Sequence, residues 1–456
     1  MLITALAAGC AFPGRLSPHR SEAGYTVVTH PDGQLYVGDQ VSFEVVAPEG
    51  GETAGHRLEI SFRGSTLGSN VFQPYGLGER SEAVFWWVWD TRGLEPGSYT
   101  VDFSSLPDGA SWTDSISLRP ASQIPAPEPE AHWTETRTVC CTIYTITGTD
   151  AARDIEALGQ AADRQSAAVS AQLGAGLKDK LTLVFIPRVL GHGGFTLNGV
   201  YVSYLDGNYV SNDMDILLHH EFVHFYDVEI GGGYRPPILE EGLAVYLTGG
   251  HYKPEELAPR AAELVPLGWY IPLAKLADDF YNQQHEIGYL EAGALIGYLV
   301  DTYGWQPFDR FYRSIPPPNG KSNSQTIDAG LRASFGITFD DLEAGYRKYL
   351  SAQTLTKSQA DDLQLTVRFF DTARHYQQAF DPSAYFLTAW LPDGVEMRQR
   401  AIVADLLRHP HGWENRYLEA ELGQAWTEIS AGEYASAGRT LNWLDGLLDF
   451  FAPLNK

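Results

Sequence analysis

The chain has 456 residues, a length that predicts about three domains. Its 32 Lys and Arg residues against 57 Asp and Glu residues leave a formal net charge of −25, which disfavours nucleic acid and anionic membranes as partners. A hydrophobic content of 44% and an aromatic content of 12% support packed cores and exclude a disordered acidic chain. No apolar run approaches the roughly 20 residues of a membrane-spanning helix, so we expect no span.

Residues 1–20 resemble the signal segment of a bacterial lipoprotein. Cys10 follows a short apolar stretch that ends in small residues, and in such signals the cysteine carries the lipid. The stretch lacks a preceding Lys or Arg and is shorter than an ordinary secretory core. We expect an exported protein, either extracellular or held at the cell surface by a lipid anchor on Cys10, with a cytoplasmic location as the alternative.

Residues 24–120 carry the pattern of a β-sandwich, and the stretch from Trp89 to Val101 resembles the end of an immunoglobulin-like module. Short segments that alternate apolar and polar residues are separated by turns rich in Gly and Pro. Within one of them Phe85, Trp87 and Trp89 share a face, and Trp86 lies on the other. We expect one face to pack in the sandwich core and the other in a domain interface. A sugar-binding aromatic platform is the alternative for the exposed face.

The rest of the chain predicts an α/β domain and a helical extension. Residues 120–132 contain four prolines and no hydrophobic period, which indicates a stiff linker at 121–132. The segment 133–352 alternates strand and helix patterns, and 353–456 has the pattern of paired helices, with a faint tetratricopeptide-like hairpin at 425–448. The fold class is therefore multidomain, with a β-sandwich, an α/β domain and a C-terminal all-α extension.

The three cysteines, Cys10, Cys140 and Cys141, cannot form a disulfide framework or a cysteine zinc site. Neighbouring cysteines can form only a strained vicinal disulfide. We therefore expect Cys140 and Cys141 to be buried thiols that pack as small hydrophobic residues.

A metal-binding pattern, His220-Glu221-x-x-His224, lies in an apolar segment predicted to be a helix from about Asp213. Residues four apart lie on one face of a helix, so both imidazoles can reach a single ion. Glu221 lies about 100° round the helix from His220, close enough to act on water beside the metal. Two histidines and a glutamate on an apolar helix would be costly to bury without a metal.

Two neighbours of this pattern have less certain roles. His219 cannot be one of a ligand pair, because Val223 stands four residues after it. We expect it behind the ligands or at the surface. Asp227 shares a face with His220 and could accept the outer N–H of a ligand imidazole, but a solvated Asp near the helix end is an equal alternative.

A catalytic zinc ion usually has three protein ligands and one water, so a third ligand is needed. The next candidates are the adjacent Glu240 and Glu241, on a helix that Pro237 would begin. The local pattern leaves both open. Glu240 shares a face with larger apolar residues, whereas Glu241 shares one with smaller side chains and precedes Gly242.

The His-Glu-x-x-His pattern followed by Glu-Gly-Leu-Ala-x-Tyr is similar to the gluzincin zinc metallopeptidases, and most of all to the peptidase MA-like family. The resemblance covers about 135–350 and implies a zincin-like domain with one Zn²⁺ per chain. The implied ligands are His220, His224 and Glu241, with Glu221 as the general base. Relatives often carry an acidic residue four positions after the third ligand, where this chain has Val245.

The resemblance also implies groups that bind the substrate. Residues 200–204 stand where gluzincins place the edge strand that pairs with an extended peptide. Tyr289 matches a tyrosine that precedes an Ala/Gly-rich helix and would stabilise the oxyanion, with His285, one helical turn earlier, as the alternative. The motif that anchors a free amino terminus in aminopeptidases is not visible near 191–196, which favours an endopeptidase.

We therefore expect a zinc-dependent hydrolase that cleaves the peptide bonds of a peptide or protein substrate, with Glu221 as its general base. One alternative is a zincin fold that only binds peptides or cell wall, for which an intact Glu221 is not needed. Another is a structural zinc site, disfavoured because three N/O ligands leave one position open. The cleavage preference and the oligomeric state stay open.

Overall fold

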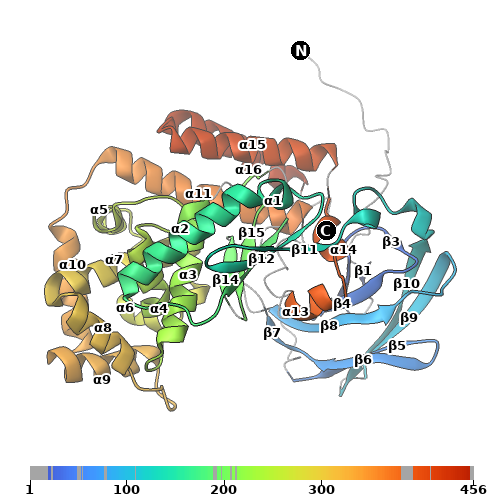
Figure 1. Ribbon diagram of the computed structural model, residues 1–456, viewed down its shortest axis with the longest axis horizontal. Coiled ribbons are helices and arrows are strands. Elements are labelled where there is room, and N and C mark those ends of the chain that lie inside the picture. The colour runs from blue at the N-terminus through green and yellow to red at the C-terminus, as the bar shows by residue number, and fades with distance from the viewer. Residues whose placement is uncertain are drawn as a thin grey trace. The chain divides into compact units, whose positions relative to one another are not determined.

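The computed structural model describes residues 19–451, except 22–23, 49–52, 54, 76–79, 108, 188–192, 197, 206–207, 211–212, 382–393 and 411. Cys10 lies outside the described residues, so its lipidation stays a prediction. The described chain forms two compact units (Figure 1). The first contains residues up to Glu130 together with 394–412, and the second contains the remainder.

The first unit consists of two five-stranded sheets around one apolar core. The first sheet has the order β1-β2-β4-β8-β7: β1 (His19–Arg20), β2 (Thr26–His30), β4 (Gln40–Val46), β8 (Arg80–Asp90) and β7 (Gln73–Tyr75). The second has the order β3-β10-β9-β5-β6: β3 (Leu35–Tyr36), β10 (Ser111–Arg119), β9 (Gly97–Leu106), β5 (Arg57–Phe62) and β6 (Ser65–Val71). Phe43 of the first sheet meets Phe103 of the second in this core, 5.9 Å apart between ring centroids. The prediction of an N-terminal β-rich region is confirmed.

The tryptophan-rich strand β8 departs from simple alternation. Phe85 and Trp89 lie in the core, as a period of two predicts. Between them the pairing of β4 with β8 shifts register, and Trp87 has a φ of 43°. Such a bulge turns its residue away from the regular face, and the indole N–H of Trp87 donates to Asp405 at 2.9 Å. The expectation that Trp87 shares a face with Phe85 and Trp89 is therefore wrong.

Residues 394–410 complete the first unit from the far end of the chain, with α13 (Gly394–Gln399) and α14 (Ala404–Leu407). The guanidinium of Arg408, whose side chain is 7% exposed, donates to both carboxylate oxygens of Asp39 at 2.7 and 2.8 Å and to Glu128 at 2.6 Å. This division differs from the expected self-contained sandwich at 24–120 and separate helical domain at 353–456. Local patterns could not reveal it, because Arg408 and Asp39 are 369 residues apart in sequence.

The second unit contains a five-stranded sheet of order β11-β12-β13-β15-β14. Its strands are β11 (Trp133–Arg137), β12 (Cys141–Ile146), β13 (Leu181–Ile186), β15 (Val200–Ser203) and β14 (Gly194–Thr196). The strands β12, β13 and β15 are parallel, and α1 (Asp150–Arg153) and α2 (Ile155–Leu173) join the first two. The expectation of an edge strand at 200–204 is wrong, because β15 is paired on both sides and β14 is the edge strand. β14 has only three residues, too few to show the alternation of apolar and polar residues by which a strand is recognised.

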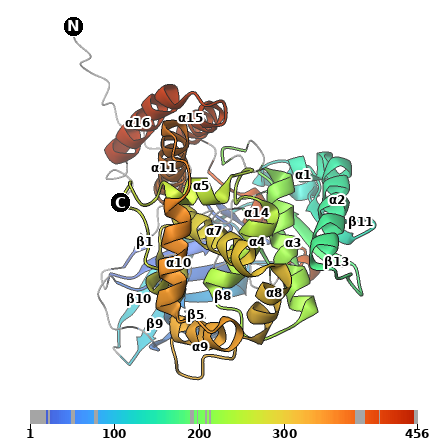
Figure 2. The same cartoon turned by 90° about the vertical axis from the view of Figure 1, so that its left-hand side faces the viewer.

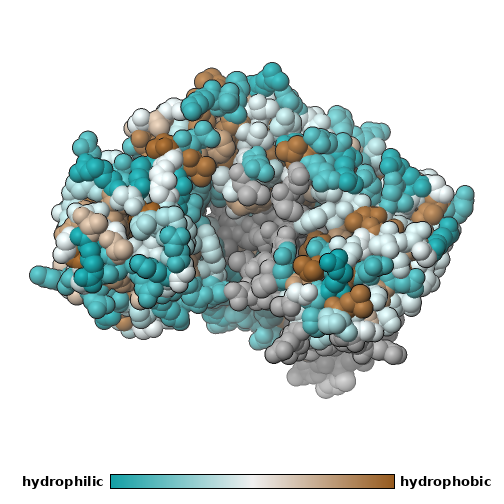
Figure 3. All heavy atoms as spheres, turned by 90° about the horizontal axis from the view of Figure 1, so that it is seen from below, coloured by the Kyte–Doolittle hydropathy of each residue, from teal (hydrophilic) through white to brown (hydrophobic). Residues whose placement is uncertain are grey.

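Helices make up most of the second unit (Figure 1, Figure 2). They are α3 (Met214–Ile230), α4 (Pro237–Thr248), α5 (Leu257–Ala262), α6 (Leu273–Asp278), α7 (His285–Tyr303), α8 (Trp305–Ser314), α9 (Asn323–Phe335), α10 (Phe339–Ser351), α11 (Lys357–Phe380), α15 (Trp413–Ser430) and α16 (Tyr434–Phe451). The last three share an apolar core, so the predicted C-terminal helical region is confirmed. None of the helices in the described ranges is long and apolar enough to cross a bilayer. The face of the molecule in Figure 3 is largely hydrophilic, with scattered hydrophobic residues.

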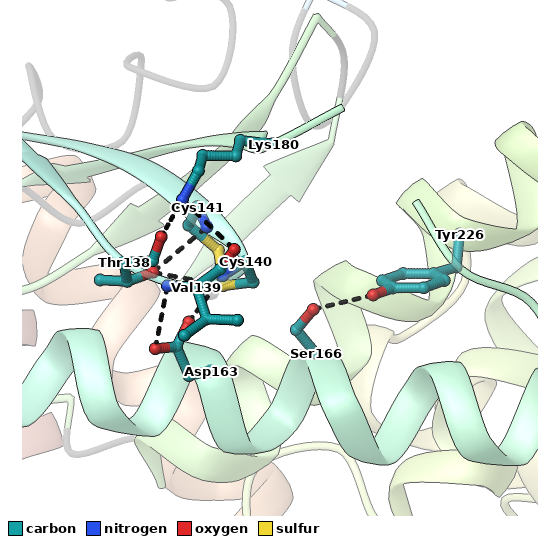
Figure 4. The surroundings of a disulfide bond; sticks show 8 residues. All are labelled: Thr138, Val139, Cys140, Cys141, Asp163, Ser166, Lys180 and Tyr226. Atoms are coloured by element: carbon teal, nitrogen blue, oxygen red, sulfur yellow. Dashed lines mark hydrogen bonds between the residues drawn. A yellow bond between two sulfur atoms is a disulfide. The ribbon is translucent and has the colours of Figure 1, made fainter. Parts of the chain in front are cut away.

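Cys140 and Cys141 form a disulfide at the turn before β12 (Figure 4). Asp163 of α2 accepts hydrogen bonds from the backbone N–H groups of Cys140 at 2.8 Å and Val139 at 3.2 Å. Lys180 donates to the Val139 carbonyl at 3.3 Å. The expected burial of Cys141 is confirmed, but the expectation of two free thiols is wrong, because this turn brings the two sulfur atoms together.

Replacing Arg408 with Ala should strongly destabilise the first unit. The change removes the cation that Asp39 and Glu128 share, and a buried charge without its partner costs about 3–5 kcal/mol of unfolding free energy. Urea unfolding of the full chain measures the loss. Arg92→Ala, whose side chain is 71% exposed in its pair with Asp90, is the control and should cause no measurable change. Equal unfolding midpoints for the two variants would show that Arg408 does not stabilise this unit.

Candidate metal centre

Two neighbouring helices bring three possible metal ligands together. Nε2 of His220 and Nε2 of His224, both on α3, lie 3.1 Å apart. Oε2 of Glu241 on α4 lies 3.4 Å from the first nitrogen and 3.1 Å from the second. Atoms that bind one zinc ion tetrahedrally at about 2.0–2.1 Å are about 3.3–3.4 Å apart. The three side chains are thus spaced as ligands of a single small cation, and their N and O atoms suit Zn²⁺.

Local sequence explains how the two helices begin and end. Asp213 caps α3, and its side chain accepts from the backbone N–H of Asp215 at 3.0 Å. Pro237 occupies the first turn of α4, where the missing N–H costs nothing, and Gly249 ends that helix in the left-handed conformation.

Glu241 is held in place by the packing of α4 on α7. A Cβ on Gly242 would lie 2.7 Å from the carbonyl oxygen of Ala292, and a Cβ on Gly293 would lie 2.4 Å from Cγ1 of Val245. Only glycine at both positions allows the helices to approach so closely. Val245 is fully buried in this contact.

The charges in the cluster favour a cation. Burial would raise the pKa of Glu241, but His224 and His220 hold it well below its ordinary value. Burial likewise opposes the charged form of His224, yet the carboxylate of Glu241 raises the pKa of His224 to about 9. The cluster thus stabilises positive charge, either as a proton on His224 or as a divalent cation that would displace this proton and bind the carboxylate and two neutral imidazoles.

Glu221 is buried beside the three ligand atoms without being one of them. Burial raises its pKa, although His220 and His224 oppose this rise. The hydroxyl of Thr196 donates to Oε2 of Glu221 at 3.0 Å. A carboxylate with a raised pKa next to a ligand cluster is suited to take up and release protons.

The two adjacent glutamates of α4 have different surroundings. Among the described residues, it is Glu241 whose carboxylate meets both histidines. The preceding Glu240 is half-buried, and burial raises its pKa. The helix turns by about 100° between neighbours, so only one of the two can face His220 and His224.

Tyr289 lies next to the ring of His220 and is not one of the three possible ligands. Its ring is 8% exposed and lies 6.1 Å from the ring of His220, between centroids. It stacks flat on His251, with centroids 4.1 Å apart. His285 stacks on Tyr289 with centroids 4.2 Å apart, and its Nδ1 lies 3.0 Å from the hydroxyl of Tyr252.

Three residues of the site were not recognised in the sequence. The hydroxyl of Tyr281, in η3 (Phe280–Asn282), donates at 2.9 Å to Oε1 of Glu241, whereas Oε2 is the oxygen that meets the histidines. His251 lies 5.2 Å from the ring of His220, and burial lowers its pKa well below the ordinary value. Thr196, on β14, donates a hydrogen bond to the buried carboxylate of Glu221. No local motif signals these residues, since tertiary packing alone brings them to the site.

His219 lies behind the ligands, buried against α2. Its Nδ1 is 2.8 Å from Gln165 and its Nε2 is 2.8 Å from Gln172. Burial lowers the pKa of His219 to about 4, so the ring is neutral at pH 7. Its role is to join α3 to α2.

Asp227 takes neither of its two expected roles. It is 2% exposed and accepts from Tyr312 at 2.8 Å, from Arg313 at 3.0 Å and from Arg235 at 2.5 Å. It therefore ties the end of α3 to α8 and to the loop before α4, and is neither solvated nor a partner of a ligand imidazole. The arginines lie too far along the chain for helix periodicity to have indicated this.

No protein-family model and no curated protein matches this chain. Among solved structures, the chain is similar to the crystal structure of an aminopeptidase N family protein from Idiomarina loihiensis, with 9% identity and a TM-score of 0.30. The match covers 73% of this chain and 77% of that protein.

Proposed function

We propose that this chain is a zinc-dependent peptidase. The observation that carries the proposal is the convergence of His220, His224 and Glu241 within 4.8 Å, with the buried carboxylate of Glu221 beside them. Three N/O ligands leave a fourth position for water or substrate, as in catalytic zinc sites. The separate carboxylate supplies the proton acceptor that hydrolysis needs, and a site that only binds a metal has no use for it.

In this proposal His220, His224 and Glu241 hold the ion. A bound Zn²⁺ would act as a Lewis acid that polarises a carbonyl group and lowers the pKa of water. Glu221 takes a proton from the attacking water and delivers it to the leaving amine. Its raised pKa allows it to hold the proton between the two steps. Tyr289 is the proposed donor to the oxyanion that develops on the scissile carbonyl.

The substrate proposed for this site is an extended peptide or protein segment. The edge strand β14 lies against Glu221, so a peptide that pairs with β14 would run past the base. We favour cleavage within a chain over removal of its first residue, since no group that would bind a free amino terminus was recognised in the sequence.

Glu221→Gln should keep the zinc and lose nearly all hydrolysis, because an amide cannot accept the proton. The expected fall in kcat is about 100-fold or more. Cleavage of a fluorogenic peptide library, with zinc content measured on the same samples, tests this. Retained turnover in the metal-loaded variant would exclude Glu221 as the base. A zinc-loaded wild-type protein that binds peptides without cleaving them would instead favour the alternative in which the fold only binds peptides.

Glu241→Ala should weaken zinc binding far more than Glu240→Ala, because only Glu241 approaches both histidines. Competition with a chromogenic chelator at one fixed pH measures both affinities, and the fixed pH matters because ligands bind metal when deprotonated. The adjacent glutamates make a matched pair, since both substitutions remove one carboxylate from the same turn of α4. If Glu240→Ala loses the metal and Glu241→Ala keeps it, the ligand assignment is inverted.

Tyr281→Phe should lower zinc affinity by about 10–100-fold, the usual cost of removing a hydrogen bond to a ligand. The change deletes only the hydroxyl that donates to Oε1 of Glu241. Tyr270→Phe is a matched control, because the hydroxyl of Tyr270 donates to Glu343 and not to a ligand. Equal zinc affinities for the two variants would mean that Glu241 is oriented without Tyr281.

A further inference from the structure

The edge strand β14 presents two residues to the general base. Gly194 and Thr196 are two apart and so lie on the same face of the strand. Both contact Glu221 of α3. Phe195, between them, points the other way, and its ring stacks on Tyr201 of β15 at 4.7 Å. This stacking and the pairing with β15 fix which face of β14 meets α3.

Gly194 allows the strand to lie directly on the base. A Cβ at this position would be 2.8 Å from Oε1 of Glu221 and 3.0 Å from its Cγ and Cδ. The φ of Gly194 lies outside the left-handed region, so its backbone would accept another residue. A methyl group at this position would force the Glu221 side chain to shift, so glycine is favoured here by the close approach of Glu221 and not by its backbone conformation.

Thr196 fixes the orientation of the carboxylate. Its Oγ1 is 3.0 Å from Oε2 of Glu221 and 3.2 Å from the backbone carbonyl oxygen of the same residue. The hydroxyl has a single proton to share between these acceptors. A β-branched residue has few side-chain conformations, so the hydroxyl stays where the strand places it. Without this donor, one oxygen of the buried carboxylate would lose its partner, which is costly.

We propose that Thr196 is a positioning residue for Glu221: β14 holds the base against the ligand cluster through the Thr196 hydroxyl and the bare surface of Gly194. This inference rests on the proposed function and extends it. The strand on which a substrate peptide would pair is the same strand that orients the base. Peptide binding and the orientation of Glu221 would thus both depend on the three residues of β14.

The first test compares Thr196→Val, which replaces the hydroxyl by a methyl group, with Thr196→Ser, which keeps the hydroxyl. The Val variant should lower kcat about 10–100-fold, as expected for a lost hydrogen bond to a charged group, and leave KM and zinc affinity within about twofold. The Ser variant should recover most of the loss. Thr142→Val, in the neighbouring strand β12, is a control for changing a threonine of the same sheet.

The second test needs no turnover. Acetohydroxamate is a small metal-binding probe whose N–H and hydroxyl groups can donate to a correctly placed carboxylate, and calorimetry gives its affinity for the zinc-loaded protein. Thr196→Val should weaken its binding when Glu221 is present and have no further effect in a Glu221→Ala background. Such non-additivity is the signature of two groups that act as one.

The outcomes separate the two proposals. If the zinc-loaded wild-type protein neither cleaves peptides nor binds acetohydroxamate, the proposed function fails and the role of Thr196 fails with it. If it does both and Thr196→Val changes neither kcat nor the probe affinity, only the assignment of Thr196 is wrong. A Val variant whose zinc affinity falls as much as its kcat would show a merely structural role.

Gly194→Ala provides a second variant should Thr196→Val not fold. Its added methyl group should displace the Glu221 side chain, so that kcat and probe affinity fall while zinc stays bound. Unchanged kcat and probe affinity in a folded Gly194→Ala protein would contradict the close approach of β14 to the base.

Discussion

The candidate metal centre depends on how closely α4 packs between α3 and α7. Gly242 and Gly293 let α4 and α7 approach so closely that a Cβ on either would collide with the opposite helix. This contact sets the depth and rotation of α4, and through them the position of the Glu241 carboxylate. A shift of 1 Å would take Oε2 of Glu241 outside the 3.1–3.4 Å range from His220 and His224 that suits one cation. Helix packing therefore decides the ligand set as much as the ligand residues do.

The site holds two buried carboxylates whose environments differ. His224 and His220 keep the pKa of Glu241 low, which suits a ligand, while burial raises that of Glu221, which suits a base. Divergent pKa values in neighbouring acids commonly separate such roles. Each carboxylate also accepts one hydroxyl from outside the two metal-binding helices, and the donors are Tyr281 for the ligand and Thr196 for the base. The orientation of both acids is thus imposed from the surrounding fold.

The first unit shows a different use of buried charge. Among the described residues, Arg408 is the cation that pairs with the carboxylates of Asp39 and Glu128, so residues 394–410 contribute to the stability of this unit. The bulge at Trp87 serves the same end, since it turns the indole N–H toward Asp405 of the returning segment. Trp87 in β8 and Asp39 in the turn before β4 thus bind partners that lie 318 and 369 residues later in the sequence.

The sequence by itself determined what depends on local periodicity. Spacing of four residues put His220 and His224 on one helical face with Glu221 beside them, and short alternating segments indicated the β-rich region. The choice of Glu241 over Glu240 needed a family resemblance, because the hydrophobic phase of α4 fits either. Tertiary structure alone decided that Tyr281, Thr196 and His251 join the site, that β14 is the edge strand, and that Cys140 and Cys141 are bonded. It also decided that residues 394–410 complete the first unit. The physical reason is that helical and strand periods act over a few residues, whereas these contacts depend on which elements pack together, and no local pattern records that.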